Sequence, residues 1–175
     1  ENCEDGILQG ALSLCGIPFV GSGCAAAAAA MDKDFTKQIV TAIGVPQARA
    51  LCVRRCEIED DLYAVVNRVL GAFALPVFVK PVNAGSSVGV TKVKQKEELE
   101  AALMQAAKYD KKVLIEEYIP GGEFEVAVLG NDNPTASCVG EIVPGSEFYD
   151  YNNKYIEDTA SYFIPARLSE QAAQK

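Results

Sequence analysis

The segment at residues 76–93 reads PVFVKPVNAGSSVGVTKV, and it decides the fold class. Apolar residues around Lys80 predict a short buried strand at 76–80, and a second strand is expected at 90–93. The loop between them, 83–89, contains two glycines and two serines. Because strand and helix signals alternate along the rest of the chain, this pair of strands predicts an α/β fold.

Lys80 and the loop 83–89 form the strongest candidate for a binding site. A lysine at the end of a buried strand is costly unless it meets a fixed anion. The loop offers backbone N–H groups and two hydroxyls to phosphate oxygens. It is not a P-loop, since no Gly-Lys-Ser/Thr closes it. Its spacing also fits an ordinary hairpin turn, so both interpretations stay open at this point.

The other predicted elements alternate between helix and strand. Helices are expected at 7–15, 24–31, 35–43, 58–70 and 96–109, with a new helix capped by Ser169 near the end. Strands are expected at 17–20, 48–53, 113–118, 123–129 and 135–143. The fold class predicted is therefore mixed α/β.

Composition excludes several classes of function. The 175 residues are 49% hydrophobic and 23% charged, which suits one packed domain or two small lobes. The net charge of −8 argues against non-specific binding of nucleic acid. The chain has no histidine, which excludes Ser-His-Asp and Cys-His catalysis and His-ligated zinc. Cys52 and Cys56 without further ligands make a poor zinc site, so no metal ligand is predicted.

The expected location rests on two features of the sequence. No apolar run approaches the roughly 20 residues that cross a bilayer. The first residues, 1–5, are acidic and lack the basic start of a signal peptide. We therefore expect no membrane partner and a cytoplasmic location.

Three further segments could carry chemistry. Residues 21–26 fit G-x-G-x-x-A, but no acidic residue follows about 20 positions on, so a plain strand-to-helix turn is preferred. Glu116 and Glu117 end a strand before Glu123; at most one of the first two faces a shared pocket, because side chains alternate. Solvated acids at a strand end explain that segment by itself. The aromatic loop 148–155 suits either an active-site cover or a surface-packed loop.

Taken in order, these motifs resemble the D-alanine–D-alanine ligases of the ATP-grasp superfamily. The resemblance runs nearly end to end and rests on EDG at 4–6 with QG at 9–10, GSG at 21–23, MDK at 31–33, FVKP at 78–81, GSSVG at 85–89, EEYI at 116–119, and FYDY at 148–151 with Lys154 and Tyr155. Each motif alone is weak, and the ordered set is specific.

The resemblance implies a reaction and a set of roles. ATP would activate the carboxylate of one D-alanine as an acyl phosphate, and the amine of a second D-alanine would displace phosphate, giving the dipeptide for peptidoglycan and the cell wall. Lys33 and Lys80 would hold phosphates beneath the loop formed by Ser86, Ser87, Val88 and Gly89. The adenine pocket would be lined by Glu116, Glu117 and Ile119, and Glu123 would bind ribose. Lys154 would reach the γ-phosphate, and the catalytic set would be Ser86, Lys154 and Tyr155.

The resemblance also implies how the chain is divided. Residues 1–30 would finish an N-terminal domain, 31–118 would form the central ATP-grasp subdomain, and 119–175 would begin the C-terminal one. The chain would be truncated at both ends, with the Mg²⁺ ligands downstream of residue 175. We therefore expect the isolated piece to be inactive, and we expect a homodimer.

Three alternatives stay open from the sequence. A D-alanine–D-lactate or D-alanine–D-serine ligase would share the ATP machinery, although Tyr155 after Lys154 resembles the dipeptide-forming type. Another ATP-grasp carboxylate–amine ligase is disfavoured by the Phe-Tyr-Asp-Tyr loop. A non-catalytic nucleotide-binding module is the alternative from another class, and Lys154 is the feature that such a module would not need.

Overall fold

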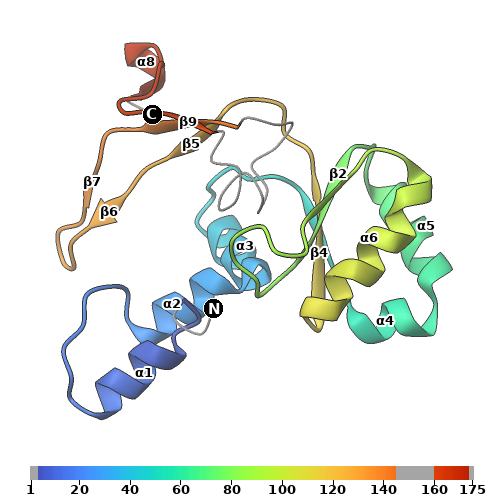
Figure 1. The fold of residues 1–175 in the computed structure, drawn as a ribbon, viewed down its shortest axis with the longest axis horizontal. Helices are drawn as coiled ribbons and strands as arrows, with labels where there is room; N and C mark the ends of the chain where they lie inside the picture. Colours follow the sequence, from blue (N-terminus) through green and yellow to red (C-terminus); the bar gives the residue numbers. More distant parts are fainter. Residues whose placement is uncertain (1–3, 145–159, 174–175) are drawn as a thin grey trace. The chain divides into compact units, whose positions relative to one another are not determined.

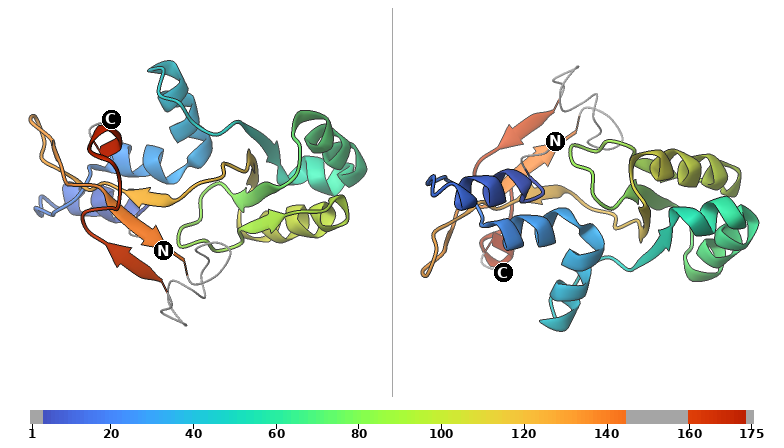
Figure 2. Two further views of the ribbon diagram at one scale, coloured as in Figure 1. Left: turned by 90° about the horizontal axis from the view of Figure 1, so that it is seen from above. Right: turned by 90° about the horizontal axis from the view of Figure 1, so that it is seen from below.

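The structure is a computed structural model that describes residues 4–144 and 160–173. The chain divides into two compact units, Glu1–Ile119 and Pro120–Lys175. Figure 1 and Figure 2 draw both units coloured along the sequence.

The first unit combines a four-stranded sheet with helices. Its elements are α1 (Ile7–Leu14), α2 (Cys24–Met31), α3 (Lys33–Ala42), β1 (Ala50–Arg54), α4 (Arg55–Asp60), α5 (Leu62–Ala72), β2 (Val77–Pro81), β3 (Thr91–Val93), α6 (Lys96–Tyr109) and β4 (Lys112–Glu117). The strand order is β1-β4-β2-β3, and every neighbouring pair is antiparallel. The mixed fold class is confirmed, and the β2 and β3 strands form where residues 76–93 predicted them.

The core of this unit lies between the sheet and the helices α4, α5 and α6 (Figure 1). Val79 of β2 pairs with Ile115 of β4, and both side chains are 0% exposed. Leu99 and Leu103 of α6 close the same core. Because side chains alternate along a strand, this register directs Lys80 away from the core, to the other face of the sheet.

The helix α6 matches the predicted range, 96–109, and hydrogen bonds at its N-terminus explain why it begins there. Glu98 accepts hydrogen bonds from the backbone N–H groups of Lys94 at 2.8 Å and Gln95 at 3.2 Å. These bonds satisfy donors that have no partner within the helix. They also lower the pKa of Glu98, since they favour its charged form.

Two expectations for this unit are wrong. The helix expected at 58–70 is two helices, because Asp61 accepts a hydrogen bond from Ala64 N at 2.9 Å and caps the start of α5. The strand expected at 17–20 does not form. Val20 is 99% exposed, and no strand among the described residues pairs with this segment. A run of apolar residues favours a strand, but it does not supply the neighbouring strand that would hold it.

The second unit contains short antiparallel strands. Its elements are β5 (Glu123–Glu125), β6 (Val128–Leu129), β7 (Thr135–Ala136), β8 (Gly140–Val143), β9 (Ser161–Phe163) and α8 (Glu170–Ala173). They form one sheet of order β5-β8-β9 and a separate pair, β6-β7. The final helix is confirmed, and Ser169 Oγ accepts a hydrogen bond from Ala172 N at 3.3 Å.

The continuous strands expected at 123–129 and 135–143 are each interrupted. Val128 pairs with Ala136, whereas Glu125 pairs with Gly140. Three residue steps on one strand (125 to 128) thus match four on the other (136 to 140), which is the extra residue of a β-bulge. Near the break, Ala127 N donates to the Ser137 hydroxyl at 3.0 Å. Strict alternation of apolar residues does not reveal this register shift.

In the part of the chain that the structure describes, no helix is both long enough and apolar enough to cross a membrane.

Candidate functional site

The candidate site lies on the sheet face opposite α6, where Lys80 meets a carboxylate. Glu116, near the end of β4, forms ion pairs with Lys80 of β2 and with Lys37 of α3. The distance from Lys37 Nζ to Glu116 Oε1 is 2.5 Å. The Lys80, Lys37 and Glu116 side chains are 20%, 18% and 15% exposed. The fixed anion that the buried strand lysine requires is therefore supplied by the protein itself.

Glu116 carries its negative charge at neutral pH. Burial acts to raise the pKa of this carboxyl group, but the charge of Lys80 and the hydrogen bond from Lys37 outweigh it, so the pKa is lowered. The site thus contains two half-buried lysines that share one ionised carboxylate.

Lys33 lies at the first position of α3 and reaches the start of the loop 83–89. Its ammonium donates to Ala84 O at 2.6 Å and to Val82 O at 3.1 Å. Burial and the positive charge of Lys80 both lower its pKa. The structure therefore brings together Lys33, Lys80 and the loop, three of the features assigned to phosphate binding.

The loop itself has an uncommon backbone. Ser86 and Ser87 have φ angles of 52° and 59°, in the left-handed region that residues other than glycine seldom adopt. Turns closed by Val88 N to Gly85 O (3.0 Å) and Val90 N to Ser87 O (3.2 Å) hold this conformation. Such strain concentrates at functional sites, and tight turns of this kind can direct successive N–H groups toward an anion.

Gly89 fixes the loop against the body of the first unit. Its φ is +70°, and a Cβ at this position would lie 2.7 Å from the Tyr109 ring and 3.1 Å from Pro81. A larger residue at position 89 would therefore displace the loop. In this structure Gly89 is a close packing point, and its predicted role in phosphate binding stays a prediction.

A second charged cluster fastens α3 to the same sheet. Lys112 of β4 pairs with Asp32 at 2.8 Å and with Asp34 at 3.1 Å, and its ammonium lies 4.6 Å from the centre of the Phe35 ring. Asp32 is 8% exposed and also caps α3 by accepting from Phe35 N at 3.0 Å. Burial acts to raise the pKa of Asp32, but Lys112 and the Phe35 N–H outweigh it, so the pKa is lowered.

The Asp32→Asn variant is expected to lower the free energy of unfolding by about 1.5–3 kcal/mol at pH 7, the range for a hydrogen bond to a charged group. Because the folded pKa lies below the unfolded one, this stabilisation is present above the unfolded pKa and is lost as pH falls through the folded pKa. Urea denaturation at pH 7 and below pH 4 measures both effects. Asp60→Asn, at an exposed position in α4, is the matched control. Equal losses in the two variants would contradict the prediction.

Two further predicted residues, Glu117 and Ile119, belong to the first unit but not to the ion-paired cluster of Lys37, Lys80 and Glu116. Glu117 accepts a hydrogen bond from Arg49 N at 2.7 Å, so only one of the two neighbouring carboxylates reaches Lys80, as alternation predicted. Ile119 is 61% exposed at the end of the first unit, and Glu123 belongs to the second. Lys154 and Tyr155 lie outside the described residues. The roles assigned to these residues stay predictions.

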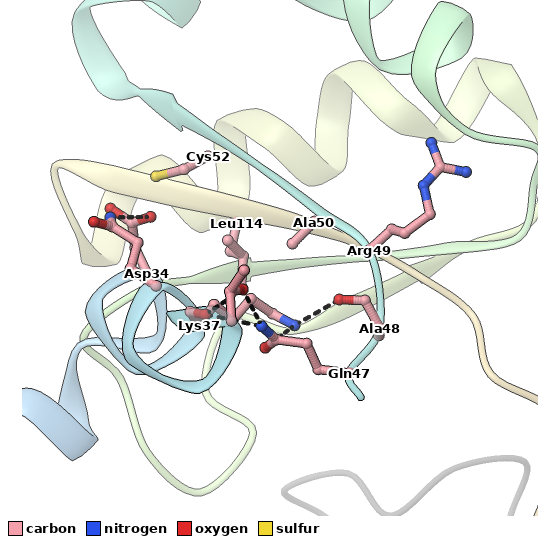
Figure 3. A pocket seen from close by; sticks show the side chains of 10 residues that line it. Asp34, Lys37, Gln47, Ala48, Arg49, Ala50, Cys52 and Leu114 are labelled. Carbon is pink, nitrogen blue, oxygen red and sulfur yellow. Dashed lines mark hydrogen bonds between the residues drawn. The ribbon is translucent and has the colours of Figure 1, made fainter. Parts of the chain in front are cut away.

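A pocket of about 530 Å³ opens between α3 and β1 (Figure 3). Its lining residues are Asp34, Lys37, Gln38, Thr41, Gln47, Ala48, Arg49, Ala50, Cys52 and Leu114. Burial raises the pKa of the Cys52 thiol to about 11, and Asp34 adds to this effect. The thiol is therefore protonated at neutral pH and is unsuited to nucleophilic attack.

Sequence reasoning missed Lys37, which shares Glu116 with Lys80. A signal was present, since Lys33 and Lys37 are four residues apart and residues at that spacing share a helix face. Among residues 4–144 and 160–173, no group of three or more His, Cys, Asp or Glu side chains could hold a metal ion. No magnesium position is therefore assigned within the described part of the chain.

Comparison with known proteins extends this description. Residues 39–175 match the family model "D-ala D-ala ligase C-terminus". The chain is 55% identical over 174 residues to the D-alanine–D-alanine ligase of Acetivibrio thermocellus, covering 99% of the chain and 46% of that protein. It is 49% identical over 172 residues to the enzyme of the same name from Natranaerobius thermophilus, covering 98% and 47%. The chain thus spans about half the length of these relatives.

Solved structures agree. The VanG D-Ala:D-Ser ligase from Enterococcus faecalis superposes with a TM-score of 0.86 at 39% identity, covering 99% of the chain and 49% of that structure. The D-alanine–D-alanine ligase from Coxiella burnetii superposes with a TM-score of 0.80 at 34% identity, covering 98% and 44%. The fold is therefore that of the ATP-grasp ligases. Within that class, the chain belongs to the D-alanine–D-alanine ligase family.

Proposed function

We propose that this chain is the central part of an ATP-dependent D-alanine–D-alanine ligase. The observation that carries the proposal is the meeting of Lys33, Lys80 and the loop 83–89 on one sheet face, in a chain 55% identical to a relative of that name. Two lysines beside a glycine- and serine-rich loop suit the triphosphate of a nucleotide. The product would serve peptidoglycan synthesis.

The reaction requires charge neutralisation and positioning more than covalent catalysis by the protein. The carboxylate of the first D-alanine attacks the γ-phosphorus, and the bond to the bridging oxygen of ADP breaks to give an acyl phosphate. The amine of the second D-alanine then attacks the acyl carbon, loses a proton and expels phosphate. Lys33 and Lys80 neutralise phosphate charge in this scheme, and Ser86 with Tyr155 orients substrate. Lys154 reaches the γ-phosphate.

The nucleotide base is assigned to the end of β4. Glu116, Glu117 and Ile119 line the adenine side, and Glu123 accepts hydrogen bonds from ribose. The backbone N–H groups of 86–89 bind the phosphates. We retain the division into 1–30, 31–118 and 119–175 as the proposed domain organisation of the whole protein.

Several properties of the whole protein belong to the same proposal. It would require Mg²⁺, for which the described part of the chain supplies no ligand cluster, so no step is assigned to the metal. It would work in the cytoplasm, where ATP is available, and would form a homodimer. Neither nucleic acid nor a membrane is expected as a partner, consistent with the net charge of −8.

A ligase that uses D-serine as the second substrate is the alternative that a specific observation favours. The VanG D-Ala:D-Ser ligase superposes with a TM-score of 0.86 at 39% identity. The relatives named D-alanine–D-alanine ligase are more similar in sequence, at 55% and 49%, so D-alanine is preferred.

The test is ADP release by the full-length protein with ATP and Mg²⁺, with and without D-alanine. We expect D-alanine to stimulate ADP release at least about tenfold, because the acyl phosphate forms only when the carboxylate is present to accept the phosphoryl group. D-serine and D-lactate, each added with D-alanine, identify the second substrate through the product formed. ATP binding without any D-alanine stimulation would overturn the substrate assignment and leave a nucleotide-binding module.

A further inference from the structure

The Lys37 ammonium already has hydrogen-bond acceptors within the protein. Its ammonium lies 2.5 Å from Glu116 Oε1, donates to Ala48 O at 2.9 Å and to Gln47 Oε1 at 3.4 Å. An ammonium has three N–H groups, so each has a partner. Figure 3 shows Lys37 directed from α3 toward Gln47 and Ala48 on the neighbouring segment. A phosphate could be bound only by giving up one of these contacts.

Lys80 is held differently. Among the described residues, its ammonium contacts one acceptor, Glu116. The Lys80 ammonium therefore has N–H groups that no described residue occupies, and these can point at a phosphate. Since Glu116 and a phosphate would attract the same ammonium, moving Lys80 to the phosphate weakens its hold on the carboxylate.

A half-buried carboxylate is costly when it loses its partner. We propose that Lys37 is a positioning residue that holds Glu116 aligned and electrically compensated, so that Lys80 is released to a nucleotide phosphate. The inference rests on the proposed function in one respect, the assignment of a nucleotide to this face of the sheet. Lys37 acts through Glu116 and does not itself touch the nucleotide.

The charges around Glu116 make this role measurable. The charged groups that face it from the described elements packed against it are Lys37 and Lys80, with Lys33 acting at longer range. When Lys80 turns to a phosphate, Lys37 is the direct partner that remains. Removing Lys37 raises the pKa of Glu116, since burial then acts with less opposition. Protonation of Glu116 would then begin at a higher pH than in the wild type.

The experiment measures binding of a fluorescent ATP analogue to the full-length protein from about pH 8 down to the lowest pH at which the protein still folds, because the acid limb assigned to Glu116 lies in the acidic range. For Lys37→Met, we expect the Kd to rise about tenfold at pH 7, the equivalent of one pKa unit of interaction. We also expect the acid limb of the binding profile to move up by about one pH unit, since an adjacent opposite charge lowers a carboxyl pKa by roughly one to three units. The kcat at saturating ATP should change less than the KM.

Three variants separate this role from a general loss of structure. Lys37→Arg keeps the charge and should restore the Kd and the acid limb. Lys112→Met removes another half-buried lysine beside α3 and should leave both unchanged, although it removes the ion pairs to Asp32 and Asp34. Adding Glu116→Gln to Lys37→Met removes the titrating group and should abolish the shifted limb. If Lys37→Met does not fold, Lys37→Gln, which can still donate to Ala48 O, replaces it.

The inference is overturned if Lys37→Met binds the analogue with the wild-type Kd and acid limb, or if Lys112→Met moves them equally. It is also overturned if the double variant retains the shifted limb. The binding assay needs no D-alanine. A wild type that binds the analogue but shows no D-alanine-dependent ADP release therefore ends the proposed ligase function alone. A wild type that does not bind the analogue ends both.

Discussion

Replacing Lys80 by methionine is expected to lower kcat/KM for ATP about a hundredfold, which corresponds to roughly 2.7 kcal/mol of lost charge–phosphate interaction. Methionine keeps an unbranched apolar side chain of similar length without the charge, so packing in β2 changes little. Glu116 keeps Lys37 as its partner, and the fold should survive. The measurement is ADP release as a function of ATP concentration in the full-length protein.

Lys112→Met is the matched control for Lys80→Met. Lys112 is also a half-buried lysine of this sheet, 25% exposed against 20% for Lys80, and it too is paired with carboxylates. Its loss should reduce stability and leave kcat/KM for ATP within about twofold of the wild-type value, a change of less than about 0.5 kcal/mol, because its ion pairs are with Asp32 and Asp34 and not with Glu116. Similar losses in the two variants would show that Lys80 serves only the fold.

Local signals predicted the fold well where the partner of each element was also nearby. The helix 96–109 carries its own cap at Glu98, and β2 and β3 are neighbours joined by one loop. The break at Asp61 was missed because the apolar stripe continues through it, from Ile58 to Val65 and Val69. The strand expected at 17–20 does not form for the opposite reason: the residues favour a strand, but no neighbouring strand among the described residues is present to pair with them.

The other features that the sequence could not predict depend on contacts between segments that are distant in the chain. The bulge between the β5–β8 pairing and the β6–β7 pairing depends on a one-residue difference in register, which the alternation of apolar residues does not reveal. At the site, the need of Lys80 for an anion was predictable from its buried strand. That the anion is Glu116 depends on the pairing of β2 with β4. That Lys37 shares it depends on how α3 packs on the sheet. Only the spacing of Lys33 and Lys37 hinted at the second contact.

The Leu103→Ala variant is expected to lower the free energy of unfolding by about 2–5 kcal/mol, the range for truncating a buried leucine. Leu103 lies in α6, is 0% exposed and belongs to the core that supports β2 from behind. The loss combines the removed apolar contacts with the cavity left behind. Urea denaturation of the full-length protein, with and without the substitution, measures it.

Met104→Ala provides the control in the same turn of α6, since Met104 is 54% exposed and should change the free energy of unfolding by less than about 0.5 kcal/mol. Variants on the two faces of the sheet should then have different effects. Leu103→Ala is expected to reduce stability while KM for ATP at low temperature stays near its wild-type value, and Lys80→Met is expected to do the reverse. If Leu103→Ala raised KM as much as Lys80→Met at a temperature where both variants are folded, the core and the site would be coupled. The view of α6 as a passive support for β2 would then be wrong.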